Sequence, residues 1–258
     1  MNRCVITGAA SGIGLALVQA LLQQSYEVIG VDVAPPPDVL QGVQGLTWLE
    51  TDLSQPDALQ QCSDTLSQGN VDMLVHSAGI SAVGLFDALD IAAQHQVLEV
   101  NLTAPIVLTT ALLASKALSQ GSSIVFISSL SHFVGYPGAS AYAASKDGIA
   151  SYASSLSLAL AAEDIHVLSV FPGPTRTPHA QRYSPDNRRE AKRMPPEKVA
   201  EAILQACSTK QRLLIPGISN KMFATLGHYL PNISEEVMRQ QILLKLEAAS
   251  QAAQQEEA

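Results

Sequence analysis

The sequence predicts an α/β protein in which helices cover both faces of a doubly wound parallel sheet of about seven strands. Short apolar, β-branched runs alternate along the chain with longer segments of helical periodicity. The runs are almost continuously apolar, as strands buried on both faces are. Because strands joined through helices cross over with a right hand, this alternation leads to a doubly wound sheet. The 258 residues fit one domain of this class.

The expected strands and helices follow one another along the chain. The strands cover residues 3–7, 27–32, 46–50, 71–76, 122–128, 165–171 and 211–215. The helices cover residues 13–24, 56–67, 87–100, 103–118, 142–162 and 196–209. Three prolines, Pro35–Pro37, follow the second strand and favour a turn there in place of a helix. We expect one domain over residues 1–248, and we expect the Gln-, Ala- and Glu-rich tail 249–258 to fray.

Composition and charge exclude several classes of protein. Only 15% of the residues are charged and 47% are hydrophobic, which excludes a disordered chain and a coiled coil. The net charge of −8 argues against nucleic-acid binding. Cys4, Cys62 and Cys207 lie far apart without metal-ligand spacing, so we expect reduced thiols, no metal site and a cytoplasmic location. No apolar stretch suggests a signal peptide or a membrane span.

Two of the expected helices lack charge. Residues 103–115 and 148–162 contain no charged side chain. A helix without a charged face is usually buried on more than one side. We therefore expect helices 103–118 and 142–162 to form the interface of a homodimer or homotetramer, with Ala153 or Leu158 facing the partner. The alternative is a Ser-, Thr- and Ala-rich surface that faces water.

A glycine-rich loop joins the first strand to the first helix. Residues 7–14 read Thr-Gly-Ala-Ala-Ser-Gly-Ile-Gly. Gly8 allows a tight turn, Gly12 lets backbone approach a pyrophosphate, and Gly14 lets the helix pack on the strand. N–H groups and the helix dipole then attract an anion. The loop thus predicts a dinucleotide site, with a purely structural turn as the alternative.

Asp32 bears on the choice of cofactor. It ends the second strand, 18 residues after Gly14. A carboxylate there accepts hydrogen bonds from ribose hydroxyls and repels a 2′-phosphate. Ala10 and Ser11 stand where an NADP site would have a cation. We therefore expect NAD(H) rather than NADP(H); the alternative is a solvated Asp at a strand end.

Tyr142 and Lys146 are the first candidate catalytic pair. They stand at i and i+4, on one face of the expected helix 142–162. A nearby ammonium and a nicotinamide cation lower the pKa of a phenol from about 10 and make it a usable base. A solvated Tyr–Lys pair on a helix surface is the alternative.

Two polar residues extend the candidate site. Ser129 follows the strand 122–128, at the edge of the sheet where ligands bind in α/β folds, while Ser128 is expected to pack inward. Asn101 interrupts an apolar helical stretch, so it is expected to kink the helix and hold a water chain to Lys146. The alternative for Asn101 is a buried amide bonded to backbone.

Residues 3–177 resemble the compact single-domain branch of the short-chain dehydrogenases/reductases. The loop 7–14 matches the family's cofactor loop, Asp52-Leu53 its adenine-contacting pair and 172–177 its segment beside the nicotinamide. The resemblance implies a Rossmann-type fold and a catalytic tetrad of Asn101, Ser129, Tyr142 and Lys146. It implies cofactor contacts from Gly8, Ser11, Gly12, Ile13, Gly14, Asp32, Asp52, Leu53, Ala78, Gly79, Asn101, Tyr142, Lys146, Pro172, Gly173, Thr175 and Thr177.

The sequence departs from the family pattern in three places. His76-Ser77-Ala78-Gly79 replaces Asn-Asn-Ala-Gly, and we expect His76 to be a satisfied histidine at the edge of the core. Thr175 stands where Val or Ile is common. Beyond residue 177 the chain runs through Leu214–Gly217 into an amphipathic tail, so the resemblance specifies neither the substrate nor the interface. Four residues give that tail its apolar side: Phe223, Leu226, Tyr229 and Leu230.

The segment 176–196 is expected to be the substrate lid, as in the family. Its basic residues are Arg176, Arg182, Arg188, Arg189, Lys192 and Arg193. They predict either an acidic substrate or a solvated helix face balanced by Asp186 and Glu190. Phe133, Tyr136 and His132 are candidates for an apolar pocket wall, with His132 as a second candidate acid/base.

The predicted function is that of an NAD(H)-dependent oxidoreductase. It interconverts a secondary alcohol and a ketone by hydride transfer, with Tyr142 as general acid/base. One alternative keeps the enzyme but oxidises a cyclic dihydrodiol or a hydroxy acid in a biosynthetic pathway. Another is a non-catalytic dinucleotide-binding regulator, against which the complete tetrad argues. The sequence indicates a small-molecule substrate, acidic or apolar, without naming it.

Overall fold

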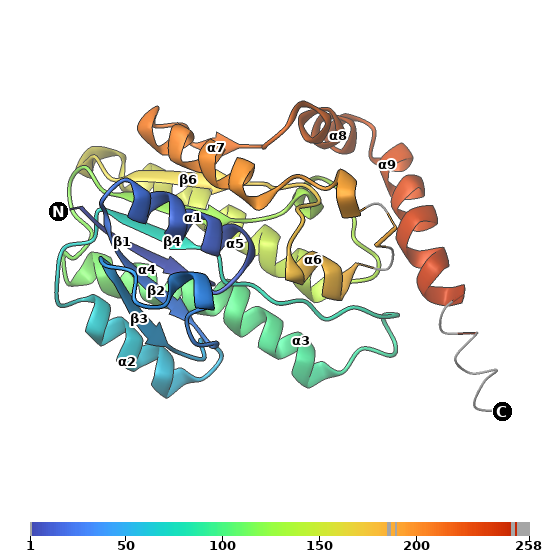
Figure 1. Cartoon of the computed structure of the whole chain (residues 1–258). Helices are drawn as coiled ribbons and strands as arrows, with labels where there is room; N and C mark the ends of the chain where they lie inside the picture. The colour runs from blue at the N-terminus through green and yellow to red at the C-terminus, as the bar shows by residue number, and fades with distance from the viewer. Residues whose placement is uncertain (1, 185–186, 189, 249–250, 252–258) are drawn as a thin grey trace.

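A central parallel sheet organises the molecule. The computed structural model describes residues 2–184, 187–188, 190–248 and 251. Seven strands form one sheet in the order β3-β2-β1-β4-β5-β6-β7, and every neighbouring pair is parallel. Figure 1 shows helices on both faces of this sheet. The predicted doubly wound α/β fold is therefore confirmed.

The strands fall close to their predicted positions. They are β1 (Arg3–Thr7), β2 (Glu27–Asp32), β3 (Leu46–Glu50), β4 (Met73–His76), β5 (Ser123–Ile127), β6 (His166–Val170) and β7 (Leu213–Leu214). All residues of β5 and β6 are buried, which explains their continuously apolar sequence. The sheet reverses its strand order between β1 and β4, and ligands bind at such a switch point.

Two hydrophobic cores lie on opposite faces of the sheet. The helices are α1 (Gly12–Gln23), α2 (Pro56–Leu66), α3 (Ile91–Leu98), α4 (Ala104–Ala114), α5 (Ser140–Ala159), α6 (Pro178–Tyr183), α7 (Pro196–Ser208), α8 (Ile218–Tyr229) and α9 (Pro231–Met238). Helices α2, α4 and α5 contribute to one core, and α1 and α7 to the other. The three cysteines are buried free thiols.

The region around Asn101 differs from the prediction of two separate helices, 87–100 and 103–118. One helical stretch runs from α3 into α4 through the π-helical turn Glu99–Thr103. The N–H of Ala104 donates to the carbonyl of Glu99, five residues back. Pro105 has no N–H to offer the carbonyl of Asn101, which is a local reason for the helix to widen here. Turns of this kind are frequent at functional sites.

The same helical stretch bears on the expectation of no membrane span. Within the described part of the chain, residues 91–114 form one helix long and apolar enough to cross a membrane by length and composition. In the fold, its buried side chains include Leu108 and Leu112, which contribute to the core beside α2 and α5.

The interface prediction needs one correction. Ala153 is fully buried in the core of its own chain, so it does not face a partner. Leu158 lies on the other side of α5 with 68% of its surface exposed. The helical period alone did not distinguish the core face of this uncharged helix from its outer face.

The carboxyl-terminal region is helical. The expected amphipathic tail forms α8 and α9, followed by a π-helical turn Arg239–Leu243. Figure 1 shows α9 at the end of the molecule opposite the amino terminus. The prediction of one domain over residues 1–248 stays a prediction. The predicted fraying of 249–258 falls outside the described residues, apart from Gln251.

Candidate active site

A large cavity opens at the carboxyl ends of the strands. Its volume is about 1430 Å³. All but two of the predicted site residues line it; the exceptions are Gly14 and Asn101. The structure thus brings together the glycine loop, the ends of β2 and β5, helix α5 and the segment 172–177, which lie far apart in the sequence.

The glycine loop is shaped for close approach of a ligand. Gly8 has φ +70°, and a Cβ there would come within 2.7 Å of the Ala78 Cα. A Cβ on Gly14 would collide with the carbonyl oxygen of Gly8, so this glycine allows α1 to pack on the loop. Ser11 precedes α1 without capping it through its side chain. The first-turn N–H groups therefore face the cavity as donors for an anion, which fits a dinucleotide pyrophosphate.

The carboxylates at the ends of β2 and β3 are held by local backbone. Asp32 accepts hydrogen bonds from the N–H groups of Ala10 at 2.9 Å and Ala34 at 3.0 Å. Asp52 accepts from the N–H of Ser54 at 2.9 Å and from its hydroxyl at 2.7 Å. Both acidic residues line the cavity. Their fixed positions suit the binding of an adenosine ribose and base.

Tyr142 and Ser129 meet inside the cavity. Tyr142 lies in the first turn of α5, and Ser129 follows β5 directly. Ser129 is close enough to Tyr142 to hydrogen-bond the phenolate and thereby lower its pKa. Burial raises the pKa of Tyr142 to about 12, the bond to Ser129 opposes the increase, and nearby Tyr136 adds to it. The expectation that Lys146 lowers this pKa is not met in the protein without cofactor, where desolvation of the phenolate dominates.

Lys146 lies one helical turn after Tyr142 and is buried. Its Nζ is 5.8 Å from the centre of the Tyr142 ring and donates to the carbonyl of Ile127 at 2.8 Å. Burial lowers the pKa of Lys146 to about 8. A Cβ on Gly79 would lie 3.3 Å from this Nζ, so a glycine there leaves room for the ammonium.

Asn101 supports the site from behind the cavity wall. Its Nδ2 donates to the carbonyl of Ile80 at 2.9 Å and to the Ser145 hydroxyl at 3.0 Å, while its Oδ1 accepts from the N–H of Ile80 at 2.9 Å. The side chain thus joins the loop after β4 to α5. This is the backbone-bonded amide that the sequence left as an alternative, and the predicted water chain to Lys146 stays a prediction.

Neighbouring polar residues have structural partners. Ser128 points inward and donates to the carbonyl of Lys146 at 2.8 Å, as predicted. His76 is buried, stacks on Phe126 and contacts the Thr109 hydroxyl at 2.8 Å through Nε2. Among the described residues none is a hydrogen-bond partner of its Nδ1, so the expectation of a satisfied histidine is only half met. Burial lowers the pKa of His76 to about 3, and Lys146 adds to the effect.

The predicted pocket wall is partly wrong. Tyr136 lines the cavity, whereas His132 and Phe133 do not. His132 is exposed and contacts Asp147 at 3.0 Å, so it is no candidate for the catalytic base. Among the described residues, the histidine that lines the cavity is His179. The sequence did not predict a role for it.

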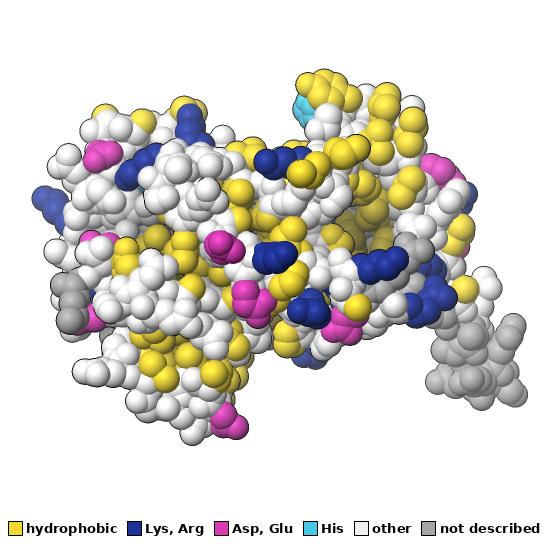
Figure 2. Space-filling view, turned by 45° about the horizontal axis from the view of Figure 1, so that its top comes forward, with side chains coloured by type: hydrophobic (Ala, Val, Ile, Leu, Met, Phe, Trp, Pro, Cys, Tyr) yellow, Lys and Arg dark blue, Asp and Glu magenta, His cyan; other side chains and the backbone are white. Residues whose placement is uncertain are grey.

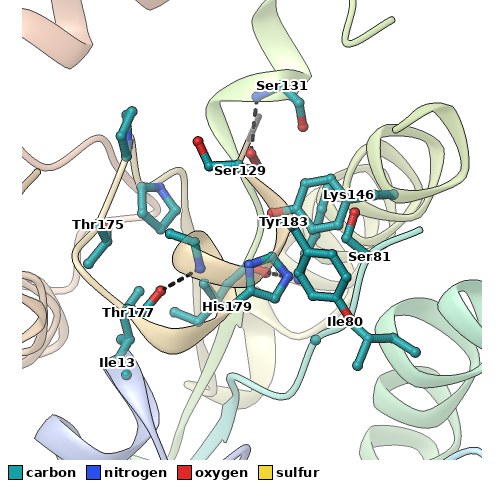
Figure 3. A pocket seen from close by; sticks show the side chains of 18 of the residues that line it. Ile13, Ile80, Ser81, Ser129, Ser131, Lys146, Thr175, Thr177, His179 and Tyr183 are labelled. Carbon is teal, nitrogen blue, oxygen red and sulfur yellow. Dashed lines mark hydrogen bonds between the residues drawn. The ribbon is translucent and has the colours of Figure 1, made fainter. Parts of the chain in front are cut away.

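His179 lies in α6, within the predicted lid. Its ring centre is 5.8 Å from that of Tyr142 and 4.8 Å from that of Tyr183 (Figure 3). Burial lowers the pKa of His179 to about 4, with contributions from Lys146 and Arg182, so the ring is neutral near pH 7. The short helix α6 is capped by Thr177, whose Oγ1 accepts from the N–H of Ala180 at 3.1 Å. The sequence does contain a sign of this helix, because Thr177 suits the N-cap and Pro178 suits the first helical position.

The carboxyl-terminal helices also contribute unpredicted residues to the cavity. They are Ser219, Asn220, Phe223, Met238, Gln241, Ile242 and Lys245. Arg188 and Arg193 line the cavity from the lid, whereas Arg189 and Asp186 lie outside the described residues. Among the described residues, no group of three or more His, Cys, Asp or Glu side chains is placed to hold a metal ion.

Comparison with known proteins identifies the family to which the chain belongs. The model of the short chain dehydrogenase family matches residues 2–188. The cis-4-hydroxycyclohexanecarboxylate dehydrogenase of Sinomonas cyclohexanicum is 32% identical over 229 residues, which cover 83% of this chain and 92% of that protein.

Two solved structures share the fold. The 4-hydroxyisoleucine dehydrogenase complexed with NADH has a TM-score of 0.75 at 24% identity, over 84% of this chain and 98% of the other. A short-chain dehydrogenase from Sphingobium yanoikuyae in complex with NADPH has a TM-score of 0.76 at 23% identity, over 88% of this chain and 93% of the other. The predicted Rossmann-type fold is thereby confirmed. The chain belongs to the short-chain dehydrogenase/reductase family, oxidoreductases that act on CH–OH groups with a nicotinamide dinucleotide.

Proposed function

We propose that the protein is an NAD(H)-dependent oxidoreductase that interconverts a secondary alcohol and a ketone. What carries this proposal is the placement of the Ser129 hydroxyl and the Tyr142 phenol together in the cavity wall, one helical turn from the Lys146 ammonium. A hydroxyl and a phenol on one cavity wall can hold and deprotonate the same substrate oxygen. The Sinomonas relative is named for 4-hydroxycyclohexanecarboxylate, whose hydroxyl is secondary, which supports this substrate class.

Each residue of the tetrad has a distinct role in this proposal. In the oxidation direction Ser129 donates to the substrate oxygen, and Tyr142 accepts the hydroxyl proton. Lys146 holds the ribose hydroxyls of the cofactor, and Asn101 keeps the loop after β4 in place against α5. When bound, the nicotinamide accepts or delivers the hydride and, in its oxidised form, adds a positive charge to the site. Because the pKa of Tyr142 is raised to about 12, mainly by burial, positive charge near the phenol is needed for base catalysis near neutral pH.

A panel of substrates tests the proposal. We expect NAD⁺ reduction with at least one secondary alcohol among alicyclic and aliphatic hydroxy acids, their amides, steroids and cyclic dihydrodiols. Aromatisation of the product would identify dihydrodiol oxidation. Tight NADH binding without turnover of any of these alcohols would favour a regulator instead.

The cofactor preference is a second expectation. We expect a higher kcat/KM with NAD⁺ than with NADP⁺, because a 2′-phosphate would lie against the Asp32 carboxylate, and such repulsion costs about 1–4 kcal/mol. Asp32→Asn keeps an oxygen acceptor for the backbone but removes the charge, so it should raise kcat/KM for NADP⁺ by about 10-fold. Steady-state kinetics with both cofactors measure this, and equal efficiency of the unmutated enzyme with both would contradict it.

Ser129 should influence the pH dependence. The hydrogen bond from Ser129 lowers the pKa of Tyr142, so its loss in Ser129→Ala leaves burial less opposed and moves this pKa upward. For alcohol oxidation at saturating NAD⁺, the rising limb of log kcat against pH should therefore shift to higher pH. A lower kcat with an unshifted limb would show that Ser129 acts on the substrate alone.

We propose a homodimer or homotetramer that uses the outer faces of α4 and α5. Leu158 is the large apolar side chain exposed on α5. Leu158→Arg should raise the dimer dissociation constant by about 10-fold or more, because burial of an unpaired charge is costly. Sedimentation velocity measures the assembly, and circular dichroism serves as the folding control. A monomeric unmutated protein would end this proposal.

A further inference from the structure

The charges that line the cavity are unevenly distributed. The acidic residues among the described lining are Asp32, the last residue of β2, and Asp52, which follows β3. Besides Lys146, the basic lining residues are Arg188, Arg193 and Lys245, from the lid and the carboxyl-terminal helix. Figure 2 shows basic side chains grouped around the rim of the hollow. Among the described lining residues, the basic side chains therefore lie toward the lid and the carboxyl-terminal helix, and the acidic ones toward the ends of β2 and β3.

Arg193 is held in place by the chain around it. Its Nη2 donates to Asn187 Oδ1 at 2.7 Å, and its N–H donates to the carbonyl of Glu190 at 2.9 Å. The next residue, Met194, pairs with the segment after β6. Its N–H donates to the carbonyl of Pro174 at 3.1 Å, and its carbonyl accepts from the N–H of Arg176 at 2.9 Å. The guanidinium is half-buried and lines the cavity. A substrate would thus meet an arginine whose position is already fixed.

Arg193 lies near a second tyrosine of the cavity wall, Tyr136. Its charge acts on Tyr136, whose pKa is raised by burial and lowered in part by Arg193. Tyr136 in turn acts on Tyr142. Arg193 and the reacting hydroxyl of Tyr142 thus have Tyr136 as a common neighbour in the cavity wall.

An apolar surface occupies the same part of the cavity. Val134, Phe223, Met238 and Ile242 line it. The helix that carries Ile242 is packed closely on the loop before α5, because a Cβ on Gly138 would come within 2.9 Å of the Ile242 Cγ2. A ligand at this end would therefore contact apolar side chains with a cationic group beyond them.

We propose that the substrate is a hydroxy acid with an apolar body, whose carboxylate is bound by Arg193 with Lys245 nearby. The inference rests on the proposed function, in that the hydroxyl of the same molecule lies at Ser129 and Tyr142. A guanidinium presents its N–H donors in a planar fork, a geometry that matches the two oxygens of a carboxylate. The apolar lining binds the carbon skeleton between the two polar ends.

Binding of acids that lack a hydroxyl tests this inference without turnover. The probes are cyclohexanecarboxylate and hexanoate, each compared with its amide, titrated calorimetrically into the protein saturated with NADH. We expect each acid to bind about 10- to 100-fold more tightly than its amide, as charged hydrogen bonds do. Arg193→Met should remove this preference, and Arg193→Lys should restore part of it. Lys192→Met is the matched control, because Lys192 is exposed in the same segment and does not line the cavity.

The outcomes separate this inference from the proposed function. Equal affinity for acid and amide, including no measurable binding of either, would overturn the carboxylate site. So would an acid preference that survives in Arg193→Met. A weaker affinity for NADH in Arg193→Met, with the preference intact, would assign Arg193 to the cofactor. Failure of every alcohol in the panel to reduce NAD⁺ would reject the proposed function, whatever the binding preference.

Discussion

Tyr142→Phe should lower kcat for alcohol oxidation by about 10²- to 10⁴-fold, the usual contribution of a general acid–base group. The phenol lines the cavity beside Ser129, and phenylalanine retains the ring that contacts His179. The proton of the substrate then has no acceptor, while the binding of NADH should change little. Stopped-flow reduction of NAD⁺ measures the first effect, and quenching or enhancement of NADH fluorescence measures the second.

Tyr152→Phe provides the matched control for this experiment. Tyr152 lies on the same helix, α5, with its ring edge against Phe126, and it does not line the cavity. Loss of its hydroxyl should leave kcat nearly unchanged. Near-normal turnover by Tyr142→Phe would show that the mechanism is wrong. His179 would then be the next candidate base, since it is the described histidine that lines the cavity.

Gly8→Ala should weaken NADH binding by about 100-fold or more and lower the free energy of unfolding by about 1–3 kcal/mol, as overpacking does. The left-handed backbone, with φ +70°, already disfavours alanine. The new Cβ would also lie 2.7 Å from both the Cα and the N of Ala78. The loop must then move away from the end of β4, and its N–H groups no longer converge on one anion. Calorimetric titration with NADH and chemical denaturation measure the two effects.

Gly42→Ala separates backbone strain from collision. Gly42 has the same φ of +70°, but a Cβ there meets nothing within 4 Å. In this variant the free energy of unfolding should fall only by the cost of placing alanine in a left-handed backbone conformation. The affinity for NADH should not change. If both variants bind NADH equally well, the contact between the loop and Ala78 has no role in cofactor binding.

The parts of this site that follow from short-range sequence patterns were predictable. The loop 7–14 and the Tyr142–Lys146 pair are local, because a strand–turn–helix and an i, i+4 spacing are set by adjacent residues. Ser129 could be found because a strand end identifies its location. Strand positions followed from continuous apolar runs, whose burial on two faces leaves a clear composition.

The missed features depend on tertiary packing. Whether His132 or His179 reaches the cavity is decided by how a loop and a short helix fold back, which no periodicity encodes. The pKa of Tyr142 was expected to fall because the sequence shows a nearby lysine but not the burial of the phenol, which has the larger effect. The C-terminal contribution to the cavity was missed because α8 and α9 lie beyond the segment where the family resemblance is close.

The π-helical turn between α3 and α4 sets the rotational phase of the two helices. An α-helix advances about 100° per residue, so the one extra residue in this turn rotates α4 by that angle relative to an uninterrupted continuation of α3. Leu108 and Leu112 point into the core with this offset in place, while Asn101 reaches the loop after β4. Deletion of one residue from Glu99–Thr103 would restore a regular helix but would turn either the asparagine or the leucines away from their partners. The chain can therefore tolerate substitutions along this helix more readily than a change in its length.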